Sequence, residues 1–324
     1  MTARPRRIDD ATRLAPSPTG ALHLGNARTF LVNWLLARQR GWRVILRIED
    51  LDGPRVKPGA AHEAIDDLVW LGLDWDEGPV YQSPRAAVYG AAIDRLIKDG
   101  FAYPCVCSRR EAQLAASAPH ADDRIAIYPG TCRGRFASVS QARALTGREP
   151  ALRFRVSRET VKFADEFAGA QNFDAAKQLS DFVIAKSDGT PAYQLAVVVD
   201  DLDMRVTHIV RGDDLLDSAA RQILIYRALG MAQKIPSYMH LPLVVGPDGK
   251  RLAKRHGDTR LSNYRKQGVQ ATRVVAMLAR WCGVPDVPCE ITALELISRL
   301  DAARIPHSPL VFVPSREAQL GFPS

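Results

Sequence analysis

The fold of this 324-residue chain is decided near its start by the stretch Arg13-Leu14-Ala15-Pro16-Ser17-Pro18-Thr19-Gly20-Ala21-Leu22-His23-Leu24-Gly25-Asn26. Its prolines stop a helix and cannot sit in a central strand, whereas the sequence after them permits a helix from near Gly25-Asn26 to Gly41. A short strand, a Pro/Gly loop and a helix N-terminus form a common setting for anion binding. His23 stands at this turn and could donate to a phosphate. The alternative is a plain strand-loop-helix joint with an incidental histidine.

Two motifs resemble signatures of the class I glutamyl-tRNA synthetase family. In that family a strand arginine precedes Ala-Pro-Ser-Pro-Thr-Gly and a His-Ile-Gly-His-like motif, which here are Arg13, Ala15 to Gly20 and His23-Leu24-Gly25-Asn26. A motif like Lys-Met-Ser-Lys-Ser follows much later as Arg251-Leu252-Ala253-Lys254-Arg255. By itself the second motif could be an exposed basic loop. Both motifs in this order, more than two hundred residues apart, indicate the family.

Composition is that of an ordinary globular protein, with 46% hydrophobic and 25% charged residues. No apolar stretch follows the basic start, and runs such as Leu195 to Val199 are too short to span a bilayer. We therefore expect a cytoplasmic enzyme with no membrane partner. Five cysteines in such a chain do not indicate a disulfide framework.

The net charge of +8 is unevenly distributed. The segment from Cys105 to Lys162 holds eleven Lys/Arg and five Asp/Glu, which is most of the excess. Such a surplus suits a polyanion, and RNA is the natural candidate. A solvated basic surface without a partner is the alternative.

Strand and helix patterns alternate, which predicts an α/β fold with a Rossmann-type parallel sheet. The first half of this nucleotide-binding fold is expected in residues 1–100, a zinc-binding insertion in 101–180 and the second half in 181–256. A short helical C-terminal region, with no anticodon-binding domain, is expected in 257–324. The expected strands are 43–48, 181–184, 193–199 and 207–210, and the expected helices are 59–71, 86–99, 215–229, 271–281 and 291–300.

The resemblance implies that ATP is a substrate and that His23, Gly25, Asn26 and Lys254 bind it. Amino-acid activation expels pyrophosphate, so the protein must position reactants and stabilise phosphate charge. His23 and the helix start at Gly25-Asn26 suit the triphosphate, Lys254 suits the leaving pyrophosphate, and Mg²⁺ is expected with ATP. His23 and Lys254 are therefore the expected catalytic residues. The second motif departs from the family at Arg251 and Ala253, but Lys254 keeps the charge.

The charges of free glutamate indicate which residues could form a pocket for it. Free glutamate carries two carboxylates and one ammonium, so its site needs two cations and one anion. Arg13 and Arg211 can bind carboxylates bidentately, and Glu49 at a strand end can meet the ammonium. For Glu49 alone, a helix-cap or surface carboxylate is the alternative. Tyr193 can hydrogen-bond the substrate, and the resemblance adds Ala15 and Ser17 to the glutamate-binding residues.

Cys105-Val106-Cys107 and Cys132 form a candidate structural zinc site, because Cys-x-Cys with a distant cysteine has the donor types that zinc prefers. The chain here resembles one subgroup, the glutamyl-queuosine tRNA(Asp) synthetases, whose zinc has a Tyr near the third Cys. That resemblance implies Tyr128 as the fourth ligand. His120, in the same loop and of a commoner ligand type, remains an alternative, as do thiols without metal.

The same subgroup implies the function. Only 70 residues follow Lys254, whereas an anticodon-reading domain usually needs about 100 or more. The subgroup activates L-glutamate without tRNA and transfers it to queuosine at the wobble position of tRNA(Asp), and we expect this activity from a monomer. One alternative is a truncated glutamyl-tRNA synthetase that charges a tRNA 3′ end. Another is an inactive RNA-binding paralogue.

Overall fold

The computed structural model describes residues 9–108, 110–112, 127–250, 252 and 259–313. Lys254, with Arg251 and Ala253 of its motif, lies outside the described residues, and so does His120.

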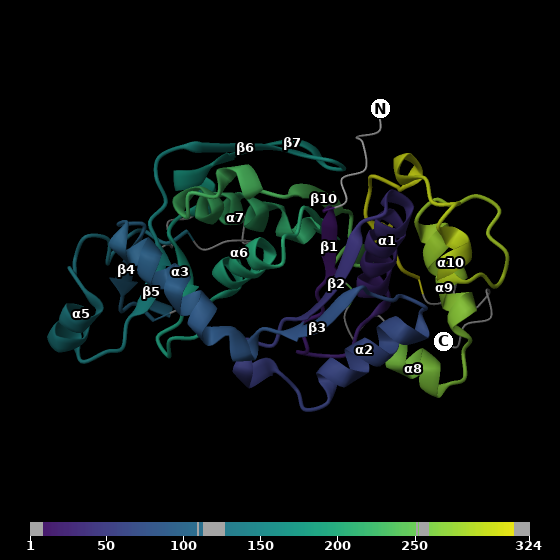
Figure 1. Cartoon of the computed structure of the whole chain (residues 1–324), viewed down its shortest axis with the longest axis horizontal. Helices are drawn as coiled ribbons and strands as arrows, with labels where there is room; N and C mark the ends of the chain where they lie inside the picture. The colour runs from purple at the N-terminus through teal and green to yellow at the C-terminus, as the bar shows by residue number, and fades with distance from the viewer. Residues whose placement is uncertain (1–8, 109, 113–126, 251, 253–258, 314–324) are drawn as a thin grey trace.

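A parallel sheet forms the centre of the molecule (Figure 1). Its strands are β1 (Ala11–Leu14), β2 (Arg43–Ile48), β3 (Glu77–Tyr81), β9 (His208–Gly212) and β10 (Ser237–Leu241). β1 pairs with β2, β2 with β3 and β9 with β10, all in parallel. Next to β9, the Thr207 backbone N–H donates to the Ala11 carbonyl at 2.9 Å, which places β9 beside β1. The spatial order β3-β2-β1-β9-β10 confirms the expected Rossmann-type parallel sheet, and the strand order reverses between β1 and β9.

Helices cover both faces of this sheet (Figure 1). The helices outside the insertion are α1 (Leu24–Arg40), α2 (Ala60–Trp70), α3 (Ala86–Lys98), α6 (Tyr193–Asp203), α7 (Leu216–Ala228), α8 (Leu261–Lys266), α9 (Ala271–Trp281) and α10 (Ala293–Leu296); α8 packs on α2, and α10 packs on α1 and α9. β2 shows how the sheet divides the core, because its side chains alternate between the faces. Val44, Leu46 and Ile48 pack in one core with α1 and α9, and Ile45 packs in a second core with α6 and α7.

The prediction of a strand over 193–199 was wrong, because these residues belong to helix α6. Three successive valines favour a strand locally, but packing of the helix against the sheet overrides that preference. The helix turns Asp200 and Asp201 into the core together, whereas a strand would point neighbouring side chains to opposite faces. This difference decides the electrostatics of the site.

The insertion contributes strands to two further groups, and the strand expected over 181–184 (β8) joins one of them and not the parallel sheet. β4 (Ala102–Cys105), β5 (Ala151–Phe154) and β8 (Phe182–Ala185) form an antiparallel sheet, and helix α5 (Val139–Thr146) lies beside it. β6 (Thr160–Asp165) and β7 (Gly169–Asp174) form a hairpin, and β6 joins the outer edge of β10 through the pair Tyr238 and Asp165. The division of the chain at 100, 180 and 256 stays a prediction, and these pairings tie its parts together.

The C-terminal region is less helical than expected. α9 covers 271–281 as predicted, but the expected helix over 291–300 is only α10, which Thr292 caps through a capping box with Glu295. β12 (Leu310–Val311) pairs with β11 (Val244–Val245) and so fastens the end of the described chain to the segment after β10. Within the described residues, no helix is long and apolar enough to cross a membrane.

Candidate active site

His23 lies at the N-terminus of α1 and caps it. Its Nδ1 accepts the Asn26 backbone N–H at 3.4 Å, while the Asn26 side chain accepts the His23 backbone N–H at 3.3 Å. A neutral ring that accepts through Nδ1 carries its proton on Nε2. Gly25 leaves room for this ring, since a Cβ there would lie 3.1 Å from two ring atoms. The helix start predicted near Gly25-Asn26 is thus at Leu24, with His23 at the positive end of the helix dipole.

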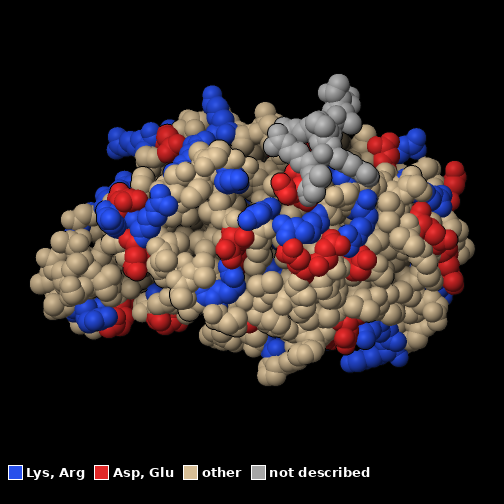
Figure 2. Space-filling model, in the orientation of Figure 1, with Lys and Arg blue, Asp and Glu red and all other residues tan. Residues whose placement is uncertain are grey.

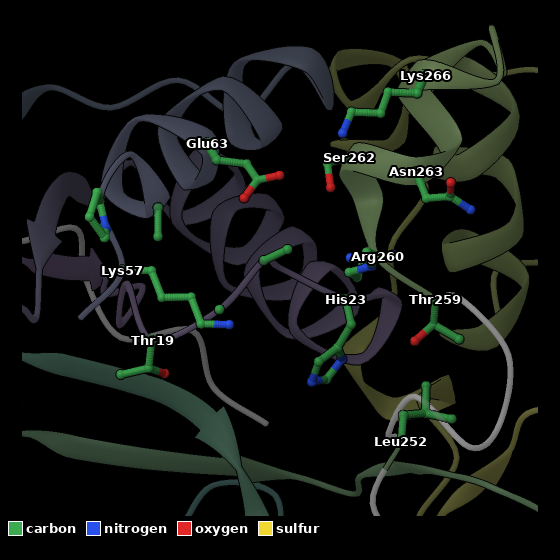
Figure 3. Close-up of a pocket in the computed structure, with 14 residues that line it drawn as sticks. Thr19, His23, Lys57, Glu63, Leu252, Thr259, Arg260, Ser262, Asn263 and Lys266 are labelled. Atoms are coloured by element: carbon green, nitrogen blue, oxygen red, sulfur yellow. The ribbon is translucent and has the colours of Figure 1, made fainter. Parts of the chain in front are cut away.

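The chain after the second motif is bonded to the His23 turn. The Leu24 N–H donates to the Thr259 carbonyl at 3.0 Å, and the Leu261 N–H donates to the Leu22 carbonyl at 2.9 Å. Leu252 and Thr259 line a pocket of about 440 Å³ together with His23 (Figure 3). The described residues on either side of 253–258 therefore reach the same pocket as His23, whereas the position of Lys254 itself stays a prediction.

A second cleft, of about 610 Å³, adjoins this pocket through the shared residues Thr19 to Ala21 and His23. All the predicted glutamate-binding residues and the described ATP-binding residues line it: Arg13, Ala15, Ser17, His23, Gly25, Asn26, Glu49, Tyr193 and Arg211. Arg13, Glu49 and Arg211 stand at or just after the carboxyl ends of β1, β2 and β9. The cleft thus lies at the reversal of strand order, where open α/β sheets place their ligands.

A buried ion-pair network lies behind the cleft, and sequence analysis missed most of it. Arg47 is fully buried, and its guanidinium donates to Asp201 at 2.6 Å and to Glu49 at 3.1 Å. Asp201 also lies 3.8 Å from Arg13 Nε. Asp200 accepts from Arg85, Gln82 and Tyr89 at 2.7 to 3.0 Å. The alternation of β2, which sends Arg47 and Ile45 to the same face, was the available sequence signal for Arg47.

Burial and charge act against each other in this network. Burial opposes the charge on Arg47, but Asp201, Glu49 and Asp200 outweigh it and hold the pKa of Arg47 above its usual value. Burial raises the pKa of Glu49, although Arg47 and Arg13 counteract it. Burial lowers the pKa of Arg13 despite the nearby Asp201. Burial thus acts against the charge of both Arg13 and Glu49, and an oppositely charged ligand at the cleft would stabilise their charged forms.

The Arg211 side chain extends from β9 to Tyr193, the first residue of α6. Its Nη1 lies 3.4 Å from the Tyr193 hydroxyl and its Nη2 donates to the Leu215 carbonyl at 3.3 Å. The next residue, Gly212, has no room for a side chain, because a Cβ there would lie 2.6 Å from an Asp214 oxygen and 2.9 Å from the Leu243 side chain. Arg211 and Tyr193 therefore form one wall of the cleft.

Cys105, Cys107 and Cys132 also come together, in the part of the insertion where β4 and α5 pack. Their sulfur atoms lie within 4.8 Å of one another, and Cys107 Sγ is 3.5 Å from Cys132 Sγ. The Tyr128 hydroxyl lies 3.4 Å from Cys105 Sγ and 3.6 Å from Cys107 Sγ, and it accepts the Cys132 N–H at 2.8 Å. Burial raises the pKa of the Cys107 thiol to about 11, so a cation nearby would be needed to hold this sulfur as a thiolate.

Part of the basic surplus of the insertion is internally neutralised. Arg133 pairs with Asp181, Arg143 with Glu149 and Arg148 with Glu111. Figure 2 correspondingly shows acidic and basic side chains side by side on the viewed face of the molecule. Arg135 and Arg155 instead lie over aromatic rings, at 5.0 Å from the Phe136 ring and 5.2 Å from the Tyr103 ring. RNA binding by this surface stays a prediction.

Comparison with known proteins identifies the family. The catalytic domain of class I tRNA synthetases (E and Q) matches residues 11–313. The chain belongs to this family. It is 50% identical over 307 residues to a glutamyl-Q tRNA(Asp) synthetase of Symbiobacterium thermophilum, covering 92% of this chain and 94% of that protein. It is 44% identical to the protein of the same name from Rhodopirellula baltica, covering 92% and 95%.

A solved structure also resembles this fold. The glutamate tRNA ligase of Elizabethkingia meningosepticum, crystallised in complex with its amino acid, aligns with a TM-score of 0.81 at 27% identity. The alignment covers 96% of this chain and 68% of that one. The fold assigned from the strand order is therefore that of a class I synthetase.

Replacing Lys254 with Ala should slow ATP–pyrophosphate exchange by about 10²-fold or more, because its charge would be needed only as pyrophosphate leaves. The affinity for the amino acid should stay near that of the wild type. Steady-state exchange kinetics would measure both. Exchange at the wild-type rate would show that Lys254 has no catalytic role.

His23 needs two variants, because it both caps α1 and faces the cleft. His23→Ala should slow exchange and also destabilise the fold by about 0.5–2 kcal/mol through loss of the cap. His23→Asn keeps a good cap but lacks Nε2, so it should slow exchange at a melting temperature near that of the wild type. Full activity of His23→Asn would assign His23 a capping role alone.

Proposed function

We propose that the chain activates L-glutamate with ATP, without tRNA, and transfers the glutamate to queuosine at the wobble position of tRNA(Asp). The observation that carries this proposal is the single cleft in which Arg13, Glu49, Tyr193 and Arg211 meet the His23 turn. The names of the two relatives given above, each matched over nearly its whole length, support the same reaction.

The first step joins the substrates. An oxygen of the glutamate α-carboxylate attacks the α-phosphorus of ATP, the bond to the β-phosphate bridging oxygen breaks, and pyrophosphate leaves. His23 donates through Nε2 to the phosphates, and the α1 N-terminus at Gly25 and Asn26 favours their negative charge. Lys254 stabilises the departing pyrophosphate, and Mg²⁺ accompanies ATP. The protein thus acts by positioning and by charge stabilisation.

Charge in the cleft selects the amino acid. Arg13, Arg47 and Arg211 are buried guanidinium groups, while Glu49 and Asp201 are the carboxylates that face them. Asp200, which lies 3.9 Å from Arg47 Nε, also accepts from Arg85, Gln82 and Tyr89. Of these groups, Arg13, Arg211 and Glu49 line the cleft, and they offer two cations and one anion to the two carboxylates and one ammonium of glutamate. Glutamine, with one carboxylate fewer, leaves an arginine without its partner.

Exchange between ATP and pyrophosphate should therefore proceed with L-glutamate in the absence of tRNA. Glutamine should react far less, because a buried arginine left unpaired costs about 1–3 kcal/mol or more. Aspartate should also react far less. The measurement is kcat/KM for exchange with each amino acid, with and without tRNA. Equal exchange with glutamine, or a strict need for tRNA, would contradict the proposal.

The second step moves glutamate to RNA. A hydroxyl of the queuosine cyclopentenediol attacks the glutamyl carbonyl, an ester forms, and AMP leaves with the electrons of the broken mixed-anhydride bond. The basic residues of the insertion, among them Arg135 and Arg155, support an approach of the tRNA from that side. A glutamyl-tRNA synthetase that charges a 3′ end remains the second candidate, and the acceptor distinguishes it.

Labelled glutamate should enter queuosine-containing tRNA(Asp) and not the unmodified form. Trimming the 3′-terminal adenosine should leave the label in place, because the ester is on the base. Binding should weaken as salt rises, since phosphate contacts release counterions. Label that enters unmodified tRNA equally, or that departs on trimming, would favour the 3′-end reaction.

We further propose one structural zinc ion per chain, held by Cys105, Cys107, Cys132 and Tyr128. The spacing of the three sulfurs and the phenol oxygen suits a tetrahedral centre. Four protein ligands close the site, so the ion holds the shape of the insertion and takes no part in the reaction. A monomeric state and a cytoplasmic location stay predictions from the sequence.

Elemental analysis of protein purified without chelators should find one zinc per chain. Cys132→Ser should lose the ion, because an essential ligand is gone. Cys282→Ser is the matched control, a buried cysteine outside the cluster that should keep the ion. Retention of zinc by Tyr128→Phe together with its loss from His120→Ala would move the fourth ligand to His120. Protein without zinc would reject the site.

A further inference from the structure

A buried chain of hydrogen bonds continues from Arg211 away from the cleft. Arg211 Nε donates to His240 Nε2 at 2.9 Å, and His240 Nδ1 lies 2.6 Å from an oxygen of Asp165. His240 is fully buried, while Asp165 and Arg211 are 4% and 5% exposed. His240 is on β10, and Asp165 ends β6 of the insertion hairpin. Neither His240 nor Asp165 lines either pocket described above.

The donor and acceptor roles along this chain are fixed by Arg211. A guanidinium has only donors, so His240 Nε2 must accept and the ring proton must be on Nδ1. Nδ1–H then donates to Asp165, which must accept. Burial lowers the pKa of His240, which keeps the ring neutral and Nε2 able to accept. The carboxylate of Asp165 therefore sets the tautomer of His240, and the tautomer supplies the acceptor for Arg211.

Asp165 is itself held in place by backbone donors. One carboxylate oxygen accepts the N–H groups of Phe167 at 3.0 Å, Ala168 at 2.7 Å and His240 at 3.1 Å. These bonds leave the other oxygen directed at the His240 ring. The hairpin turn and β10 thus both orient Asp165, and an amide in its place could not satisfy all four donors.

We propose that Asp165 and His240 are positioning residues, which hold the Arg211 guanidinium in the orientation that binds a substrate carboxylate. Arg211 has three directional contacts on the protein side, to His240, Tyr193 and Leu215. Without His240 as acceptor, the guanidinium can rotate about its long side chain and loses the fixed fork that matches a carboxylate. The inference rests on the proposed activation of glutamate, and it assigns a role in that site to the insertion hairpin.

Asp165→Asn tests the tautomer. If its amide nitrogen faces His240, the ring proton must move to Nε2, where it meets the Arg211 Nε–H. If the amide is reversed, its nitrogen meets the three backbone N–H groups. In either case we expect the KM for glutamate in tRNA-independent exchange to rise about tenfold to a hundredfold. The KM for ATP and kcat should change little, because the lost interaction concerns amino-acid binding.

Two variants of His240 distinguish its role as a hydrogen-bond acceptor from its role in packing. His240→Gln can place an amide oxygen near the Nε2 position, so it should restore much of the affinity for glutamate. His240→Asn places its amide near Nδ1 and offers nothing to Arg211, so its KM for glutamate should rise as in Asp165→Asn. Met239→Leu is the control, a buried residue of β10 that packs in the other core. Melting temperatures of all four variants report any general loss of stability.

The outcomes are distinct. A selective rise in the KM for glutamate, with better function of His240→Gln than of His240→Asn, supports the positioning role. An unchanged KM for glutamate in Asp165→Asn overturns it, as does an equal loss of kcat and of both affinities that follows the melting temperature. Absence of glutamate-dependent exchange in the wild-type protein would instead overturn the proposed function.

Discussion

The site depends on the buried pairing of Arg47 with Asp201. Moving two such charges out of water costs several kcal/mol per ion, and good geometry with further hydrogen bonds must offset that cost. Arg47 meets this need through Asp201 and Glu49, which lie on a helix and after a strand that are distant in sequence. The same contacts hold Glu49 at the cleft and leave Arg13 beside the shared carboxylate Asp201. Removal of either Arg47 or Asp201 would leave a buried charge without its partner.

The local sequence was sufficient to predict those parts of the site that belong to short sequence motifs or lie next to them. The prolines and glycines before α1 predicted the loop and the helix start to within two residues, and the end of the strand expected over 43–48 predicted the place of Glu49. The cysteine spacing predicted that Cys105, Cys107 and Cys132 meet, and the family resemblance added Tyr128, which lies beside them. These predictions succeeded because each rests on chain geometry over a few residues, or on the rule that places ligands at strand ends.

Long-range packing explains what was missed. The valines of α6 favour a strand by themselves, and only their contact with the sheet makes the helix that presents Asp200 and Asp201. Asp165 and His240 are 75 residues apart, and neither belongs to a recognisable motif. Their contact results from the parallel pairing of β6 with β10. This pairing consists of one register pair, and no local sequence pattern predicts it. The rest of the site could therefore not be read from the sequence.

The pairing of β6 with β10 determines which part of the insertion is structurally independent of the central sheet. An insertion between two halves of a fold could be an independent appendage, joined only by its two connections. Here its hairpin covers the edge of β10, and the Glu166 N–H donates to the Tyr238 carbonyl at 2.8 Å. An exposed β10 would present unpaired backbone groups, which attract other strands. Exchange of the insertion between related enzymes thus has a natural boundary: the hairpin has to stay with β10, and only the sheet of β4, β5 and β8 with its cysteine cluster is a candidate for separate variation.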